Sequence, residues 1–324
     1  MKLRVLQVGF GSLGKQICKE ILPDNRFKIL QIIDKNPSLK GLDPGKPFKI
    51  KTKFRIQNEL KNSKPDVIIH STISKISDAY EQFKDLARYK SPILSTCEEL
   101  VYPTKKNNEI AQKIDRLAVK NQIPILGIGV NPGYLMDSLV LSLSNLFLDV
   151  KSIKVSRTVD LSKRRKALQE KMFVGKRITQ FKSHQTSLGH VGLEESATMI
   201  CDHFKIKPTI RRTLYPILAK RKLNNKFFDV KKGDVIGISE KLLALNRKKV
   251  FLKMNLDMHL GAEDIDSISI NGSHSVKFQT SGVNGDKATI AILLNHIQPI
   301  TNQGSGLFVV DGTNIRKFDP KSQG

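Results

Sequence analysis

The chain has 324 residues, 39% of them hydrophobic and 26% charged, which fits a globular protein with two domains or one large α/β unit. Lys and Arg give a formal net charge of +25, but they are scattered along the chain without a DNA-binding or aromatic-interleaved RNA-binding motif, so no nucleic-acid partner is expected. No apolar run reaches the roughly 18 residues of a membrane-spanning helix, and the N-terminus does not read as a signal peptide, so no membrane partner is expected.

The cysteines and histidines give no pattern of a metal site. Cys18, Cys97 and Cys201 are widely spaced and form no CxxC pair, and the seven histidines form no HExxH or HxH motif. A disulfide framework and a bound metal are therefore not expected. A reducing compartment, the cytoplasm, is the predicted location.

The first half of the chain alternates strand and helix. Apolar runs rich in β-branched residues predict strands, and apolar residues at helical spacing predict helices between them. This alternation is typical of βαβ units with a parallel sheet, here a Rossmann doubly wound fold. The predicted strands are residues 3–9, 27–34, 65–72, 91–97 and 123–130, and the predicted helices are residues 12–22, 76–89 and 108–122.

The pattern changes after residue 137. Helices are predicted over residues 138–147, 162–175 and 194–204, with a strand over 150–161, and separated strand signals follow from residue 210 to 270. These features favour a second α/β domain with an antiparallel or mixed sheet and helices on one face. A helix over 287–300 is expected to lie back near the first domain. The predicted boundaries are residues 1–135, 136–282 and 283–324, the last being a C-terminal segment that returns to the Rossmann domain.

The segment "VGFGSLGK" predicts a dinucleotide site. Gly9, Gly11 and Gly14 fit the pattern GxGxxG, directly after a strand and at the start of a helix. Gly9 allows the tight turn, Gly11 lets the backbone approach the pyrophosphate, and Gly14 permits close packing of helix on strand. The other residues of the turn predicted to bind the cofactor are Phe10, Ser12 and Leu13.

Asp34 ends the second predicted strand, twenty residues after Gly14. A carboxylate at this position can accept hydrogen bonds from the adenosine ribose hydroxyls. It would repel the 2′-phosphate of NADP, whereas the adjacent Lys35 could pair with that phosphate. NAD is therefore slightly favoured over NADP.

Polar residues also follow the third predicted strand. His70, Ser71 and Thr72 end this strand at the carboxyl edge of the sheet, where they could border the nicotinamide ribose. The alternative is that Ser71 to Ser74 only cap the helix that follows. Both interpretations stay open at the level of sequence.

The segment "STCEELVYP" follows the next strand at the same edge. Ser95 with Glu98, or Thr96 with Glu99, fits the S/T-x-x-E capping box, but one box leaves the other glutamate unexplained. A carboxylate beside a bound nicotinamide could hold ammonium, or take a proton from an amine. Glu98 and Glu99 are both candidate catalytic residues.

The motifs together resemble the dihydrodipicolinate-reductase-like family, in the group that includes 2,4-diaminopentanoate dehydrogenase and the native amine dehydrogenases. The resemblance rests on "VGFGSLG", "STCEEL.YP", "GIGVNPGYLMD", "TSLGHVGLEES" and "NGDKATIAILLN", which occur in this order across nearly the whole chain. It implies a second α/β domain for substrate binding and homodimerisation, with NAD(P)H-dependent conversion of ketone plus ammonia into amine. It also places a glutamate at the reacting amine, which maps onto Glu98 or Glu99.

The chain also departs from that family. Dihydrodipicolinate reductase itself carries paired histidines followed by a lysine and a Ser-Gly-Thr stretch, and these are missing from this sequence. The lysine-pathway reaction is therefore not expected. The sequence identifies no second polar site for a distal ammonium, so a simple alkyl amine or ketone stays open as substrate.

The segment "GIGVNPGYLMD" ends the last Rossmann strand where the chain crosses to the second domain. Asn131 could hydrogen-bond the nicotinamide carboxamide or the substrate, and Pro132 fixes the turn. Tyr134 could form a wall of the reaction cleft, and His190 could shape the pocket. The alternatives are a rigid domain hinge for the turn and an ordinary hydrogen-bonded turn residue for His190.

These features predict an NAD(P)H-dependent amine dehydrogenase, an oxidoreductase acting on CH–NH2 donors, with a small amine, or a ketone and ammonia, as reactants. The first alternative is a dihydrodipicolinate-reductase-like imine or carbonyl reductase. The second is a dinucleotide-binding regulator without turnover, since a fold alone does not establish a function.

Overall fold

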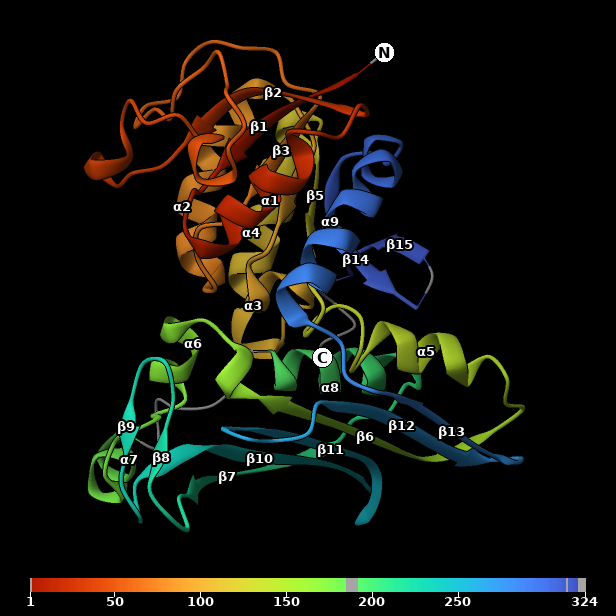
Figure 1. Ribbon diagram of the computed structural model, residues 1–324. Coiled ribbons are helices and arrows are strands. Elements are labelled where there is room, and N and C mark those ends of the chain that lie inside the picture. The colour runs from red at the N-terminus through yellow and green to blue at the C-terminus, as the bar shows by residue number, and fades with distance from the viewer. Residues whose placement is uncertain (1, 185–191, 313, 320–324) are drawn as a thin grey trace. The chain divides into compact units, whose positions relative to one another are not determined.

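A computed structural model of the chain describes residues 2–184, 192–312 and 314–319 (Figure 1). The chain forms two compact units, each with its own sheet. The first comprises residues 1–134 and 285–324, and the second comprises residues 135–284. The chain therefore leaves the first unit after Tyr134 and re-enters it at Gly285.

The first unit is built on a seven-stranded sheet. Its strand order is β15-β14-β5-β4-β3-β1-β2, with every neighbouring pair parallel except β14 and β15. The chain runs outward from β1 to β2 and then continues from β3 on the other side of β1, as in a doubly wound sheet. The strands are β1 (Leu3–Val8), β2 (Phe27–Ile33), β3 (Val67–His70), β4 (Ile93–Ser95), β5 (Pro124–Gly127), β14 (Gly306–Asp311) and β15 (Asn314–Lys317).

Helices cover this sheet, and its central strands are buried along their whole length, as expected for parallel strands covered on both faces. Helix α9 packs on α1, β4 and β5, whereas α4 packs on α2, β5 and β14. The helices are α1 (Ser12–Ile21), α2 (Ile76–Leu86), α3 (Glu98–Val101), α4 (Asn108–Asn121) and α9 (Gly285–Thr301), with 3₁₀ helices η1 (Pro37–Leu39), η2 (Lys46–Phe48), η3 (Ala87–Tyr89) and η4 (Lys105–Asn107).

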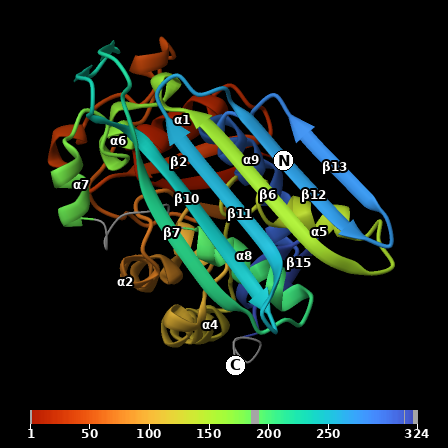
Figure 2. The ribbon, with the colours of Figure 1, turned by 90° about the horizontal axis from the view of Figure 1, so that it is seen from below.

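The second unit is a six-stranded mixed sheet with helices (Figure 2). Its order is β13-β12-β6-β11-β10-β7, in which β6 and β11 are parallel and the other pairs are antiparallel. Helix α8 packs on β10 and β11, and α5 packs on α8. The strands are β6 (Val150–Asp160), β7 (Thr209–Leu218), β10 (Val235–Asn246), β11 (Lys249–His259), β12 (Ile265–Gly272) and β13 (Ser275–Thr280), with a small pair β8 (Leu223–Asn224) and β9 (Asp229–Val230).

The predicted Rossmann sheet and the predicted mixed sheet are thus confirmed, but α5 and α6 are shorter than the helices that the sequence suggested over 138–147 and 162–175. The helices of the second unit are α5 (Ser138–Ser144), α6 (Lys166–Lys171), α7 (Ile178–His184) and α8 (Leu193–His203), with the 3₁₀ helix η5 (Leu161–Lys163). The predicted helix over 162–175 is wrong at both ends. Asp160 accepts the N–H of Ser162 and starts η5, and Phe173 and Gly175 have left-handed backbone angles that stop α6.

Candidate active site

The glycine-rich turn between β1 and α1 has a different constraint at each glycine. Gly9 has a φ of +101°, and a Cβ there would lie 2.5 Å from the carbonyl oxygen of Ser71. A Cβ on Gly14 would lie 2.2 Å from the carbonyl oxygen of Gly9, so α1 approaches the turn too closely for any side chain. Gly11 is different, because a Cβ there would meet no atom within 4 Å. The turn therefore leaves open space at Gly11, where a bound phosphate would lie.

The remaining turn residues divide into buried and exposed ones. The Phe10 side chain lies in the hydrophobic core, so only its backbone can face a ligand. Leu13 packs partly against the same core, whereas Gly11 and Ser12 are exposed. Helix α1 begins at Ser12, with Gly11 as its N-cap and no acidic side chain in the first turn. The positive end of the helix dipole is therefore available to an anion.

Asp34 is held rigidly at the carboxyl end of β2. Its Oδ2 accepts the Phe10 N–H at 2.6 Å, and its Oδ1 accepts the Asn36 N–H at 2.8 Å. The Asn58 amide donates to the carbonyl oxygens of Asp34 and Asn36, which fixes the turn from the other side. Each carboxylate oxygen has a second lone pair, so Asp34 can still accept from a ribose hydroxyl.

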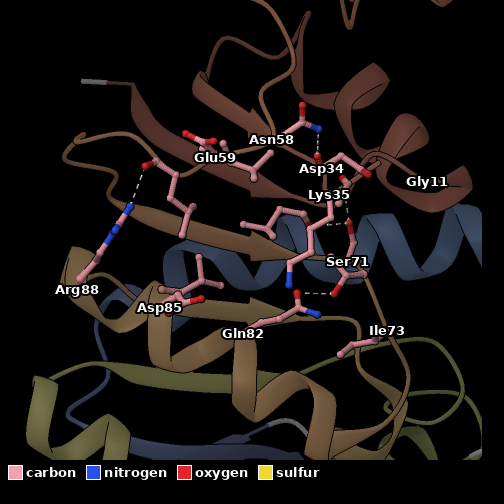
Figure 3. A pocket seen from close by; sticks show the side chains of 16 residues that line it. Gly11, Asp34, Lys35, Asn58, Glu59, Ser71, Ile73, Gln82, Asp85 and Arg88 are labelled. Atoms are coloured by element: carbon pink, nitrogen blue, oxygen red, sulfur yellow. Dashed lines mark hydrogen bonds between the residues drawn. The ribbon is translucent and has the colours of Figure 1, made fainter. Parts of the chain in front are cut away.

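A pocket of about 630 Å³ lies beside this turn (Figure 3). Several residues that line it carry no motif and were missed in the sequence, because they come from the segment after β2 and from the α2–η3 region. The exposed Lys35 extends into it. The lining residues are Val8, Gly9, Gly11, Ile33, Asp34, Lys35, Asn58, Glu59, Leu60, Ser71, Thr72, Ile73, Gln82, Asp85, Leu86 and Arg88.

The polar residues after β3 do not cap α2. The N-cap of this helix is Lys75, which makes no side-chain cap, and the Ser71 hydroxyl instead donates to Val8 O at 3.3 Å. The capping interpretation of Ser71 to Ser74 is therefore wrong. Ser71 and Thr72 line the pocket, but the His70 side chain is fully buried and does not reach it.

His70 is bonded on both ring nitrogens. Its Nδ1 lies 2.8 Å from Ser95 Oγ, and its Nε2 lies 2.8 Å from Thr72 Oγ1 and 3.0 Å from Gln82 Oε1. Burial lowers the pKa of His70 from 6.5 to about 4, because the charged imidazolium would lose its hydration. At neutral pH the ring is uncharged.

This shift predicts a loss of stability in acid. Between pH 6.5 and 4 the unfolded chain protonates its His70, whereas the folded chain does not, so the free energy of unfolding falls as the pH falls. From pH 7.5 to 5 the loss is about 2 kcal/mol. Urea unfolding at both pH values, compared with His70→Asn, measures it. A variant with the same slope as the parent chain would contradict the assignment.

The two glutamates of the "CEE" segment have different surroundings in the structure. Glu99 Oε2 accepts the backbone N–H of Ile76 at 3.0 Å, so Glu99 caps the start of α2. Both capping-box interpretations are wrong, because α3 has Cys97 as its N-cap and no side-chain cap. Glu98 is the first residue of α3 and is half-buried. The Glu99 carboxylate therefore has a structural role at the start of α2.

The cysteines are buried thiols. Burial raises the pKa of Cys18, Cys97 and Cys201 to about 12, so each stays protonated and is a poor nucleophile. Cys97 Sγ donates to Ser74 O at 3.1 Å and so helps to hold the turn before Glu98.

The turn after β5 is tightly built. The Asn131–Pro132 peptide bond is cis, and Gly133 has a φ of +124° with space for no Cβ, since Gly129 O would lie 2.6 Å away. Asn131 Oδ1 is buried and has no hydrogen-bond partner among the residues that the structure describes. Such an acceptor is unusual in a folded protein, and a ligand amide could satisfy it.

The end of this motif lies in the second unit and has a structural role there. Asp137 is fully buried, caps α5 through the Ser138 N–H, and accepts the Ser196 hydroxyl at 2.6 Å. The segments "NPGYLMD" and "GLEES" are thus joined by a hydrogen bond. Tyr134 is 39% exposed at the end of the first unit. His190, a predicted substrate residue, lies outside the described residues.

The strand order places the candidate residues in a row. Asp34 follows β2, Gly11 follows β1, Ser71 follows β3, Glu98 follows β4 and Asn131 follows β5, and these strands are successive neighbours in the sheet. Four spacings of about 4.8 Å make this edge roughly 19 Å long. An extended ligand can therefore lie along the edge, with its ribose end at Asp34 and its other end near Glu98 and Asn131.

Within the described part of the chain, no group of three or more His, Cys, Asp or Glu side chains could hold a metal ion. The helices in the same residues include none that is long and apolar enough to cross a bilayer.

Comparison with known proteins gives a family match. Residues 134–317 match the family of the 2,4-diaminopentanoate dehydrogenase C-terminal domain. The chain is 27% identical to 2,4-diaminopentanoate dehydrogenase from Acetoanaerobium sticklandii, over 94% of this chain and 92% of that protein.

Solved structures show the same fold. The amine dehydrogenase from Mycobacterium smegmatis has a TM-score of 0.87 and 18% identity, over 99% of this chain and 98% of the other. The WlbA dehydrogenase from Bordetella pertussis, in complex with NADH and UDP-GlcNAcA, has a TM-score of 0.53 and 14% identity, over 94% of this chain and 91% of the other. The myo-inositol 2-dehydrogenase from Lactobacillus plantarum has a TM-score of 0.56 and 10% identity, over 100% and 93%.

Proposed function

The chain belongs to the 2,4-diaminopentanoate dehydrogenase family, and we propose from this premise that its reaction is the reversible reductive amination of a ketone or aldehyde with ammonia. It is an NAD(P)-dependent amine dehydrogenase, an oxidoreductase acting on amine donors. The observation that carries the finer proposal is the row of residues from Asp34 to Asn131 along one sheet edge. Its substrate is proposed to be a small amine that resembles 2,4-diaminopentanoate, the substrate in the relative's name.

The residues present fit a nicotinamide dinucleotide. The open space at Gly11 and the start of α1 would hold the pyrophosphate, and Asp34 would accept from the adenosine ribose. The buried Oδ1 of Asn131 would accept from the carboxamide at the other end. When bound, the cofactor supplies hydride transfer to or from the carbon that carries nitrogen.

Glu98 is proposed to act on the nitrogen of the substrate. A carboxylate at the end of β4 can hold ammonium by a charge-assisted hydrogen bond; it can take up a proton from the ammonium group of the amine before oxidation, and return that proton to nitrogen when the amine forms. Glu99 is bound to Ile76 N and is not proposed for this role. The protein thus orients the reactants and exchanges a proton with the substrate nitrogen.

The test is a matrix of ketones and aldehydes with NADH or NADPH, with and without ammonium. We expect oxidation of the cofactor to need both the carbonyl compound and ammonia. Equal rates without ammonia would show a carbonyl reductase instead. Cofactor binding without turnover over the whole matrix, or in reverse with amines, would show a regulator.

We further propose that NAD is preferred over NADP, because the fixed carboxylate of Asp34 would repel a 2′-phosphate. Asp34→Asn should raise the ratio of kcat/KM for NADPH to that for NADH about tenfold, which corresponds to about 1.4 kcal/mol. Asp24→Asn, which changes a half-buried carboxylate paired with Arg26, is the control and should leave the ratio unchanged. A parent enzyme that prefers NADPH, or an unchanged ratio in Asp34→Asn, would contradict the proposal.

A homodimer in the cytoplasm is also proposed. The second unit exposes apolar side chains on β7, with Tyr215 53% exposed and Leu218 37% exposed. The three unpaired thiols suit a reducing compartment. Sedimentation velocity tests the assembly, and a single monomeric species at micromolar concentration would overturn it.

A further inference from the structure

A buried chain of hydrogen bonds runs behind the wall of the dinucleotide pocket, from the turn that precedes Glu98 to the α2 helix. The Cys97 N–H donates to Ser95 Oγ at 3.1 Å, and Ser95 Oγ lies 2.8 Å from His70 Nδ1. On the other side of the ring, His70 Nε2 lies 3.0 Å from Gln82 Oε1. His70 and Ser95 are fully buried, and the ring also packs edge-on against Phe83.

The direction of these hydrogen bonds follows from Gln82. Its Oε1 can only accept, so His70 carries its ring proton on Nε2 and donates it to Gln82 Oε1 and Thr72 Oγ1. The unprotonated Nδ1 then accepts from the Ser95 hydroxyl, whose oxygen accepts the Cys97 N–H. Burial keeps the ring uncharged at neutral pH, so it carries a single proton.

The chain of hydrogen bonds ends at Gln82. The Thr72 hydroxyl donates to Gln82 Oε1 at 2.9 Å, so this oxygen receives two donors from the protein. Gln82 also lines the pocket (Figure 3), as Thr72 does, and its hydrogen bonds to described residues are made through Oε1. With its oxygen occupied, Gln82 can offer the pocket only its N–H groups. Ribose and phosphate oxygens of a dinucleotide are acceptors that match such a donor.

At its other end, the chain of hydrogen bonds holds the turn before Glu98. Cys97 is the N-cap of α3, and Glu98 is the next residue. We propose that His70 is a positioning residue which fixes the Gln82 amide as a donor to the bound dinucleotide and, through Ser95, holds the turn that carries Glu98. The part that concerns Glu98 rests on the proposed function.

Two variants test the two ends separately. Gln82→Met keeps the length of the side chain but removes both donors, and should weaken NADH binding about tenfold, as measured by fluorescence titration of the folded protein. Ser95→Ala removes the link to Cys97 and leaves Gln82 in place. It should keep the Kd for NADH within about twofold but lower kcat about tenfold.

The tautomer of His70 gives a readout that needs neither cofactor nor turnover. Long-range ¹H–¹⁵N correlation spectra of the protein should show a neutral ring protonated on Nε2, and Ser95→Ala should shift the Nδ1 resonance. The control is His296→Asn, because His296 is a partly buried histidine of the first unit that is bonded through Nδ1 to Ile292 O. This variant should change neither NADH binding nor kcat.

The outcomes separate this inference from the proposed function. A ring protonated on Nδ1, or Gln82→Met with the parent affinity for NADH, overturns the inference whatever the enzyme's substrate is. A parent chain that binds NADH but aminates no carbonyl compound refutes the proposed function, while the binding and tautomer measurements still decide the role of His70 and Gln82. An unchanged kcat in Ser95→Ala would refute the part of the proposal in which His70, through Ser95, holds the turn that carries Glu98.

Discussion

Glu98→Gln should lower kcat by about two to four orders of magnitude, whereas Glu99→Gln should keep most of the turnover. The first substitution removes the carboxylate that is proposed to hold ammonium and to exchange a proton at the substrate nitrogen. The second keeps an oxygen that can still accept the Ile76 N–H, so the cap of α2 survives. Initial rates of reductive amination with saturating NADH and ammonium, normalised to folded protein, give the comparison.

This pair of variants is well matched, because the two residues are adjacent and each substitution removes one negative charge from the same turn. The Kd for NADH should change by less than about twofold in both, so that a loss of kcat reports on chemistry. If Glu99→Gln were the inactive variant, the assignment of roles would be reversed. Full activity in both would remove the glutamates from the mechanism altogether.

The glycine-rich turn and its position between β1 and α1 could be predicted from the sequence alone, because the constraints on this turn are local. Gly9, Gly11 and Gly14 lie within six residues, and Asp34 follows β2, which is the next element after α1. The requirement for space at these glycines is a backbone property that GxGxxG expresses by itself. The parallel sheet was likewise visible in the alternation of apolar runs.

The contacts of Glu99 and His70 could not be predicted in the same way. Both glutamates fit the spacing of a capping box, and the partner of Glu99 proved to be Ile76, 23 residues earlier in the chain. His70 meets Ser95 because β3 and β4 are neighbours, and it meets Gln82 because α2 folds back over β3. Contacts of this kind form only when strands and helices pack together, so the spacing of residues in the sequence does not predict them.

Gly14→Ala should lower the stability of the protein, whereas Gly11→Ala should leave stability nearly unchanged and weaken cofactor binding. A Cβ on Gly14 would lie 2.2 Å from a backbone carbonyl oxygen, which cannot move aside without shifting β1 or α1. We expect Gly14→Ala to lower the free energy of unfolding by on the order of 4 kcal/mol. Urea denaturation followed by circular dichroism measures this change.

Gly11→Ala should leave that stability nearly unchanged, since its Cβ meets no atom within 4 Å and its φ of −68° suits any residue. The new methyl group would occupy the space proposed for the pyrophosphate, so NADH binding should weaken about a hundredfold, or about 2.8 kcal/mol. The pair thus separates the two demands that the turn makes on glycine, close packing at Gly14 and ligand approach at Gly11. A Gly11→Ala protein that binds NADH as tightly as the parent chain would show that the cofactor phosphates lie elsewhere.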